Sequence, residues 1–159
     1  GMKSALRQDP DIILVGEMRD LETMRMAMEA AETGHLVFGT VHTTDVAATI
    51  SRIVQMFPTE EQQAARVQLL SSLRFIIAQQ LLPKLGGGRV AAREFLEFTP
   101  DLRKKLLELN PATLFNELKD ATALEGVTMM GAVRANYDQG LITPEELRRW
   151  ELILQEATT

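Results

Sequence analysis

Two short apolar runs, each followed by a segment with helical periodicity, constrain the fold of this chain more than any other feature. Residues 11–16 contain four consecutive branched aliphatic side chains, and residues 36–41 form a second run that favours a strand. Apolar residues recur at helical spacing in 21–31 and again in 46–57. We therefore predict a right-handed strand–helix–strand–helix unit with a parallel sheet, whose first strand is buried on both faces.

Capping residues set the expected ends of the helices. Asp20 is placed to cap the first helix, and Gly34 to stop it, because glycine tolerates the left-handed backbone conformation. Thr59 and Gln62 have the spacing of a capping box, and apolar residues continue at helical spacing as far as Leu81. We therefore expect one long helix over residues 59–81.

The pattern changes after this helix. Three glycines at residues 86–88 predict a turn that joins two antiparallel segments, 80–85 and 89–98. From residue 99 onward the sequence indicates only short helices, several of which begin with a capping residue followed by proline. These capping residues are Thr99, Asn110 and Thr143.

Composition excludes several kinds of site. The chain of 159 residues has no cysteine, which rules out disulfides and thiolate metal sites, and its two histidines are too few for a histidine-rich metal cage. A formal charge of −5 argues against broad nucleic-acid binding, so we expect no direct nucleic-acid partner. No apolar run is long enough to cross a bilayer and no signal peptide is visible, so we expect a cytoplasmic location.

Glu17 is the first candidate for chemistry. It follows the last aliphatic residue of the first predicted strand by two positions, and open α/β sheets bind ligands beyond the carboxyl ends of their strands. A carboxylate there can hold Mg²⁺ through water, or orient and deprotonate an attacking water. The alternative is an acid that only caps the strand end or pairs with Arg19, and the pattern leaves both open.

His42 is the second candidate. It lies at the carboxyl end of the second predicted strand, beside the hydroxyl groups of Thr40 and Thr43. Neighbouring parallel strands would place Glu17 and His42 at the same edge of the sheet, where an imidazole could hydrogen-bond a terminal phosphate. The alternative is a histidine bonded to a nearby backbone carbonyl, and for His35 that structural role is the more common one.

Two segments give the sequence a family resemblance. Residues 9–20, Asp-Pro-Asp-Ile-Ile-Leu-Val-Gly-Glu-Met-Arg-Asp, resemble the Walker B segment of the type II/type IV secretion ATPases. Residues 33–43, Thr-Gly-His-Leu-Val-Phe-Gly-Thr-Val-His-Thr, resemble the histidine box of the same family, in the same order and spacing. Residues 79–83 and 88–94 are similar to the family's continuation, so the resemblance covers residues 5–100 well.

The resemblance implies a fold and an activity. The fold would be α/β: the C-terminal part of a RecA-like P-loop NTPase domain over residues 3–98, followed by a small helical bundle over residues 99–159. The full-length protein would be a homo-hexamer that hydrolyses ATP with Mg²⁺ to power type IV pilus retraction or assembly, or secretion. It would be held at the inner membrane through a pilus or secretion platform protein.

The same resemblance implies roles for individual residues. Glu17 would be the Walker B glutamate that acts on the catalytic water, near a Mg²⁺ ion held through water rather than directly by the protein. His42 would be the histidine-box residue near the γ-phosphate, with His35 as a secondary member. The other motif residues associated with the nucleotide would be Gly16, Arg19, Thr40 and Thr43.

The chain also departs from the family pattern. Residues 83–88 lack the four-cysteine insert of assembly and type II secretion members, which favours the retraction, or twitching-motility, branch; yet Lys104 stands where that branch has an asparagine. No Gly-x-x-x-x-Gly-Lys-Ser/Thr loop occurs in the sequence, and such a loop holds the nucleotide phosphates. We therefore expect a portion of a longer ATPase, inactive alone, that binds neither ATP nor Mg²⁺ tightly.

Other hypotheses stay open. The chain is alternatively a non-catalytic interaction or regulatory module of a pilus or secretion motor, or a fragment of a conjugation or DNA-transfer ATPase. An incomplete sheet would also expose an apolar edge, which invites pairing with another chain. We therefore expect this chain to self-associate, as a dimer or a strand-swapped form.

Overall fold

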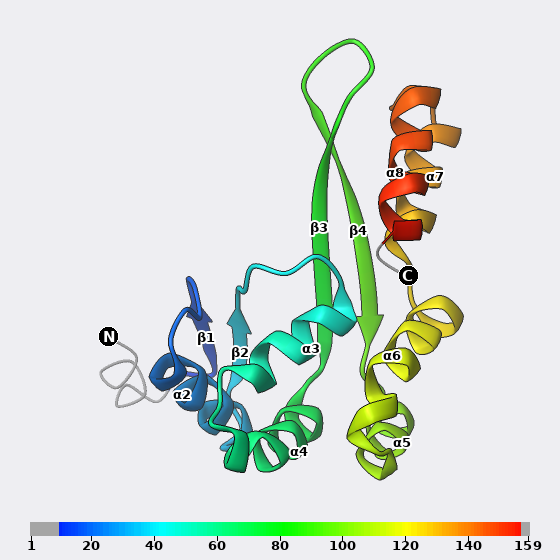
Figure 1. The fold of residues 1–159 in the computed structure, drawn as a ribbon. Helices are drawn as coiled ribbons and strands as arrows, with labels where there is room; N and C mark the ends of the chain where they lie inside the picture. The colour runs from blue at the N-terminus through cyan, green and yellow to red at the C-terminus, as the bar shows by residue number, and fades with distance from the viewer. Residues whose placement is uncertain (1–9, 157–159) are drawn as a thin grey trace. The chain divides into compact units, whose positions relative to one another are not determined.

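The computed structural model describes residues 10–156, so Asp9, the first residue of the Walker B-like segment, lies outside the described residues. Within residues 10–156, no helix is long and apolar enough to cross a membrane. In chain order (Figure 1) the helices and strands are β1 (Ile12–Val15), α2 (Leu21–Glu32), β2 (Leu36–Gly39), α3 (Val46–Gln55), the 3-10 helix η1 (Thr59–Glu61), α4 (Gln62–Ser72), β3 (Phe75–Pro83), β4 (Arg89–Glu97), α5 (Pro100–Glu108), α6 (Pro111–Glu125), α7 (Met129–Asp138) and α8 (Pro144–Glu156).

The chain folds into two compact units built from interleaved segments. One unit comprises the described residues up to 43 together with 48–74 and 98–115, and the other comprises 44–47, 75–97 and the described residues from 116 onward. The first unit contains the sheet β1–β2 and the second contains the sheet β3–β4. This mixture of strands and helices confirms an α/β chain, while the division at residues 98/99 stays a prediction.

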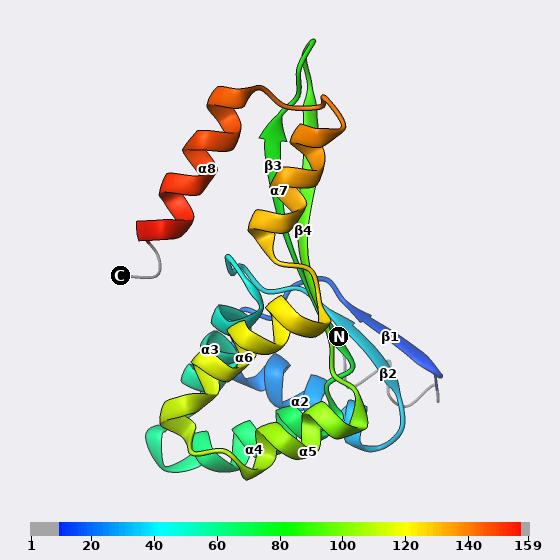
Figure 2. The ribbon, with the colours of Figure 1, turned by 90° about the vertical axis from the view of Figure 1, so that its right-hand side faces the viewer.

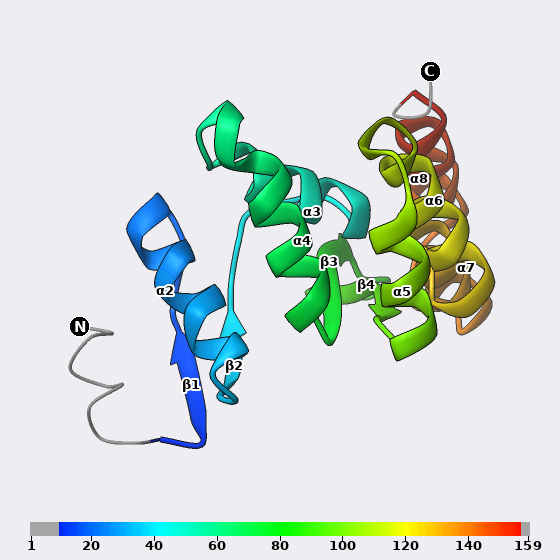
Figure 3. The same cartoon turned by 90° about the horizontal axis from the view of Figure 1, so that it is seen from below.

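Strands β1 and β2 pair in parallel, as the sequence predicts. The register aligns Ile12 with Leu36 and Val15 with Gly39. Helix α2, which connects the two strands, lies against the pair (Figure 3). The strand–helix–strand order is thus the scaffold on which both candidate motifs are carried.

The prediction that β1 is buried on both faces is wrong. Ile13 and Val15 pack with Ala30 of α2, whereas Ile12 and Leu14 are 60% and 77% exposed. Successive side chains of a strand point to opposite faces, and α2 covers only the face that carries Ile13 and Val15. The opposite face of the sheet is exposed and apolar, and its side chains are Ile12, Leu14, Leu36 and Phe38.

The ends of α2 are those that the sequence predicts. The backbone N–H of Thr23 donates to the Asp20 carboxylate at 2.8 Å, so that Asp20 caps the first turn. Gly34 follows the last turn with a φ of 97°, in the left-handed region that glycine enters without strain. The chain then turns directly into β2.

The long helix expected over residues 59–81 is wrong beyond Ser72. Helix α4 ends there, and Ile77 and Leu81, which lie at helical spacing in the sequence, belong to strand β3. Both side chains are more than half exposed. The capping box does not form either, since Gln62 donates its side-chain amide to the carbonyl of Phe57 at 3.1 Å.

The glycine turn is confirmed; β3 before it begins five residues earlier than expected, and β4 after it ends one residue earlier than expected. Strands β3 and β4 pair antiparallel from Phe75 opposite Glu97 to Pro83 opposite Arg89. Residues 86–88 form the tip of this hairpin (Figure 1), and all three glycines have φ between 79° and 107°. Any other residue would be strained at these positions.

The hairpin supplies one side of a core in the second unit. Leu82 and Ala92 pack with residues of α7 and the segment that follows it, and α7 runs alongside β4 (Figure 2). Helix α8 adds partly buried side chains to this core. The buried residues of this core are Leu82, Ala92, Met129, Val133 and Ile142, and the α8 residues against it are Leu147, Trp150 and Leu154.

Gly126 permits a close backbone approach between the end of α6 and β4. Val127 and Phe95 exchange two backbone hydrogen bonds of 2.9 Å each. A Cβ atom at residue 126 would lie 2.2 Å from the carbonyl oxygen of Phe95, which is far inside van der Waals contact. The glycine therefore fixes where the chain turns towards α7.

Helices α4 and α5 pack side by side in the first unit (Figure 2). Arg103 of α5 donates to the carbonyls of Ser71 and Leu73 at the end of α4, at 3.3 and 3.5 Å. Arg66 of α4, which is 5% exposed, donates in turn to the carbonyl of Leu109 just beyond α5, at 3.3 Å. Each cation therefore meets the negative end of the other helix.

The three capping residues before prolines act as predicted. Thr99 and Thr143 accept backbone N–H bonds from residues three positions later, each at 3.2 Å. Asn110 accepts from Ala112 at 2.9 Å. These caps define the starts of α5, α8 and α6.

Two adjacent leucines test whether side chains along β3 alternate between buried and exposed positions. Leu82 is fully buried and Leu81 is 51% exposed, so the alternation of a strand predicts very different effects of truncation. We expect Leu82→Ala to lower the free energy of unfolding by about 2–5 kcal/mol, and Leu81→Ala to lower it by about 1 kcal/mol or less. Urea denaturation of the two variants measures this, and equal losses would contradict the strand.

Candidate functional site

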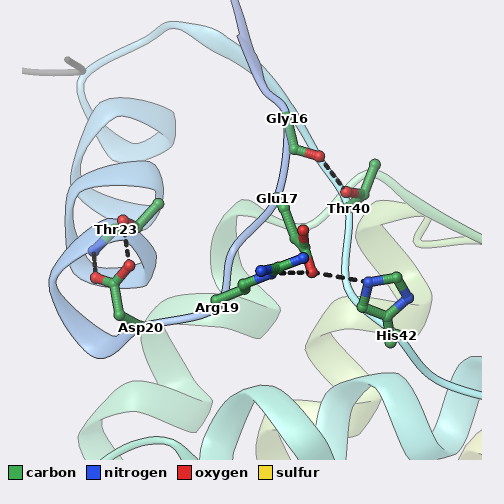
Figure 4. A network of polar contacts seen from close by, with 7 residues as sticks. All are labelled: Gly16, Glu17, Arg19, Asp20, Thr23, Thr40 and His42. Atoms are coloured by element: carbon green, nitrogen blue, oxygen red, sulfur yellow. Dashed lines mark hydrogen bonds and ion pairs between the residues drawn. The ribbon is translucent and has the colours of Figure 1, made fainter.

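The carboxyl ends of β1 and β2 bring the two candidate residues together. Glu17 follows β1 by two residues and His42 follows β2 by three. The Nε2 atom of His42 lies 2.8 Å from Oε1 of Glu17 (Figure 4). The predicted placement of an acid and an imidazole at one edge of the sheet is therefore confirmed.

Arg19 completes this cluster. Its Nε atom lies 2.5 Å from Oε1 of Glu17, so the arginine and the histidine engage the same carboxylate oxygen. The hydrogen bond from Arg19 lowers the pKa of Glu17 most; partial desolvation opposes this, and the bond with His42 lowers the pKa further. Glu17 is thus firmly ionised at neutral pH.

The three side chains differ in exposure. The Glu17 side chain is 27% exposed, whereas those of Arg19 and His42 are 77% and 87% exposed. The partly buried carboxylate of Glu17 is therefore bonded by two side chains, those of Arg19 and His42, that face solvent. Both can leave the carboxylate without disturbing a packed core.

Gly16 and Thr40 fix the strand ends on which this cluster rests. The Thr40 hydroxyl donates to the carbonyl of Gly16 (Figure 4). The backbone N–H of Met18 donates to the carbonyl of Thr40 at 3.0 Å. These bonds extend the parallel pairing beyond the last residue of each strand. Glu17 lies between the two bonded residues, so its backbone is held on both sides.

Thr43 ties the His42 loop to the next helix. Its hydroxyl lies 2.7 Å from the hydroxyl of Thr49 on α3, and Thr49 is 6% exposed. Thr49 was missed in the sequence. The signal that could have found it is a hydroxyl residue on the buried side of an otherwise apolar helix, where a polar group needs a partner.

His35 does not join the cluster. It lies before β2, at the opposite end of the strand from His42, and its Nδ1 atom lies 3.0 Å from the carbonyl of Ala30 and 3.2 Å from the Thr33 hydroxyl. This is the arrangement of a histidine that stabilises a helix end. Its place as a secondary member of the histidine box has no support from this geometry.

The cluster suits a metal ion that is held through water. Across the part of the chain that the structure describes, no group of three or more His, Cys, Asp or Glu side chains is arranged to hold a metal ion directly. Glu17 offers one ionised carboxylate, which can bond the water shell of a cation or orient a single water molecule.

Comparison with known proteins shows what this chain is similar to. A family model described as "Type II/IV secretion system protein" matches residues 1–124. The type IV pilus retractation ATPase PilT of Pseudomonas aeruginosa is 49% identical over 147 residues, which is 92% of this chain and 43% of that protein. The chain therefore spans less than half the length of this relative.

Solved structures give the same picture. The X-ray structure of the Legionella pneumophila ATPase DotB superposes with a TM-score of 0.91 at 36% identity, over 98% of this chain and 42% of that one. The crystal structure of the pilus retraction motor PilT with bound ADP superposes with a TM-score of 0.78 at 47% identity, over 92% of this chain and 41% of that one. The fold described above is thus shared with part of each of these ATPases.

The charge balance of the cluster makes a testable prediction. Arg19→Gln removes the group that lowers the pKa of Glu17 most, so this pKa should rise towards the ordinary glutamate value, and by more than in His42→Ala. Because the folded-state pKa is depressed, ionised Glu17 stabilises the fold at neutral pH, and this contribution is lost as the pH falls through the depressed pKa. Carbon-13 NMR titration of the Glu17 carboxyl group measures the shift.

Arg74→Gln is the matched control, since it removes an exposed arginine that does not affect the Glu17 pKa. An unchanged Glu17 titration in Arg19→Gln would show that the ion pair does not persist in solution.

Proposed function

This chain belongs to the type II/IV secretion system protein family, and we propose on that premise that it supplies the Walker B glutamate and the histidine box of an ATPase that drives pilus retraction. The observation that carries the proposal is the contact of 2.8 Å between Glu17 and His42 at the ends of adjacent parallel strands. The fold would be the C-terminal part of a RecA-like domain. ATP binds such domains beyond the carboxyl ends of the strands.

Glu17 is the residue that we propose acts on the attacking water. Its lowered pKa makes it a weak base, so its main contribution is to hold and orient the water as an ionised hydrogen-bond acceptor. Arg19 and His42 both bond to Oε1, and we therefore assign the water to Oε2. Bound MgATP would supply the phosphoryl group and the charge of the metal ion.

His42 is the residue that we propose senses the terminal phosphate. Its side chain is 87% exposed, so it can exchange the Glu17 carboxylate for a phosphate oxygen. A bond to one acceptor excludes the other at the same nitrogen. The imidazole would thus hold Glu17 when the phosphate is absent and release it when the phosphate is present.

The assembly that we propose is a homo-hexamer docked on an inner-membrane platform protein, at the cytoplasmic side. The retraction branch is supported by the similarity to PilT, a protein named as a pilus retraction motor, and by the absence of cysteine where other branches carry a zinc motif. Lys104, in place of the branch's asparagine, lies on α5. Nucleotide would be held mainly by a phosphate loop, of which this sequence contains none.

Glu17→Gln in the parent protein tests the proposal. Replacing the carboxylate by an amide removes the acceptor for the water, so kcat should fall by about 10²–10⁴-fold while the KM for ATP changes little. Steady-state phosphate release measures both constants. Glu29→Gln, the same substitution at an exposed position on α2, should leave both unchanged. Full ATPase activity in Glu17→Gln would contradict the proposed role of Glu17 in orienting the attacking water.

Residues 1–159 by themselves should release no phosphate from ATP above the buffer background. They should also self-associate, because the exposed face of β1–β2 carries four large apolar side chains. We expect Leu14→Glu, at a position that is 77% exposed, to convert the associated form to a monomer without unfolding it. Light scattering at high concentration measures the mass. Hydrolysis that depends on Glu17, or a monomeric wild-type chain, would contradict this expectation.

A further inference from the structure

Glu94 on β4 accepts hydrogen bonds from the starts of two helices. The backbone N–H of Val46, the first residue of α3, donates to Oε1 at 2.8 Å. The backbone N–H of Met129, the first residue of α7, donates to Oε2 at 3.0 Å. One carboxylate therefore serves as a shared N-terminal cap for helices that begin 83 positions apart in the sequence.

A carboxylate suits this contact because it has two acceptor oxygens. The first N–H groups of a helix have no partner within the helix, and they form the positive end of its dipole. Glu94 is half-buried, so water replaces a lost partner poorly at this position. Its two oxygens satisfy one such group on each helix, which a neutral amide with a single acceptor oxygen cannot do.

Val46 follows the segment that carries His42. That segment is anchored at its beginning by the bonds between Thr40, Gly16 and Met18, and in its middle by the contact between Thr43 and Thr49. Its end is anchored where Glu94 holds the first N–H of α3. The histidine thus lies on a short stretch of chain whose two ends are held by hydrogen bonds, each within its own unit.

We propose that Glu94 is a positioning residue for His42, which acts by fixing the start of α3. This inference rests on the proposed function, because it assigns Glu94 to the ATPase site through His42. Glu94 bonds the backbone N–H of Val46, so its effect on His42 passes along the backbone from Val46. Loss of the cap would loosen the first turn of α3 and let the loop between Thr40 and Val46 take up other conformations.

The test compares Glu94→Gln with Glu97→Gln in the parent protein. Glu97 lies on the same strand, three residues further on, and is exposed. In Glu94→Gln we expect backbone amides at the starts of α3 and α7 to exchange with deuterium at least about tenfold faster, as loss of a hydrogen bond to a charged group implies. The nitrogen-15 shifts of the His42 ring should also change. Glu97→Gln should alter neither.

Kinetics then separate positioning from a purely structural role. We expect Glu94→Gln to lower kcat by about tenfold with little change in the KM for ATP, and Glu94→Asp, which keeps the charge, to recover part of the loss. Should Glu94→Gln fail to fold, the same measurements on Glu94→Asp decide the matter.

Faster exchange at the helix starts with unchanged His42 shifts and unchanged kcat would overturn the positioning role while leaving the proposed function intact. The proposed function itself fails separately, if Glu17→Gln remains active.

Discussion

The parallel register of β1 and β2 is the constraint on which the candidate site depends. Ile12 pairs with Leu36 and Val15 with Gly39, so the two strands end level with one another. Glu17 and His42 are each only two or three residues past those ends, which leaves little freedom in where their side chains start. A one-residue slip of register would reverse the facing of one strand and separate the acid from the imidazole.

Patterns that are local in sequence were the ones that could be predicted. The strand–helix–strand order, the Asp20 cap, the Gly34 stop and the glycine turn each depend on a few adjacent residues. The placement of Glu17 beside His42 followed from the rule that parallel strands end at one edge. The burial of the second face of β1 could not be predicted from local patterns. Whether other segments pack over Ile12 and Leu14 depends on residues outside β1.

Two other differences between the sequence prediction and the structure, at β3 and at Glu94, have physical causes. The apolar residues from Phe75 to Leu82 fit both a helical and an alternating pattern, and the pairing with β4 decided between them. The capping role of Glu94 depends on amides that are 48 and 35 positions away in sequence. No spacing rule connects an acid in a strand with helix starts at such distances, so this contact emerges only from the folded chain.

The shared carboxylate of Glu94 also bears on how α3 and α7 lose structure. Separate acceptors for the first N–H groups of α3 and α7 would let their first turns fray independently, each with its own free energy. One acceptor that serves both makes those free energies interdependent, since a rotation of its side chain away from either amide disturbs the other bond as well. The first turns of the two helices should accordingly open as one cooperative event, although they begin 83 positions apart in a chain of 159 residues.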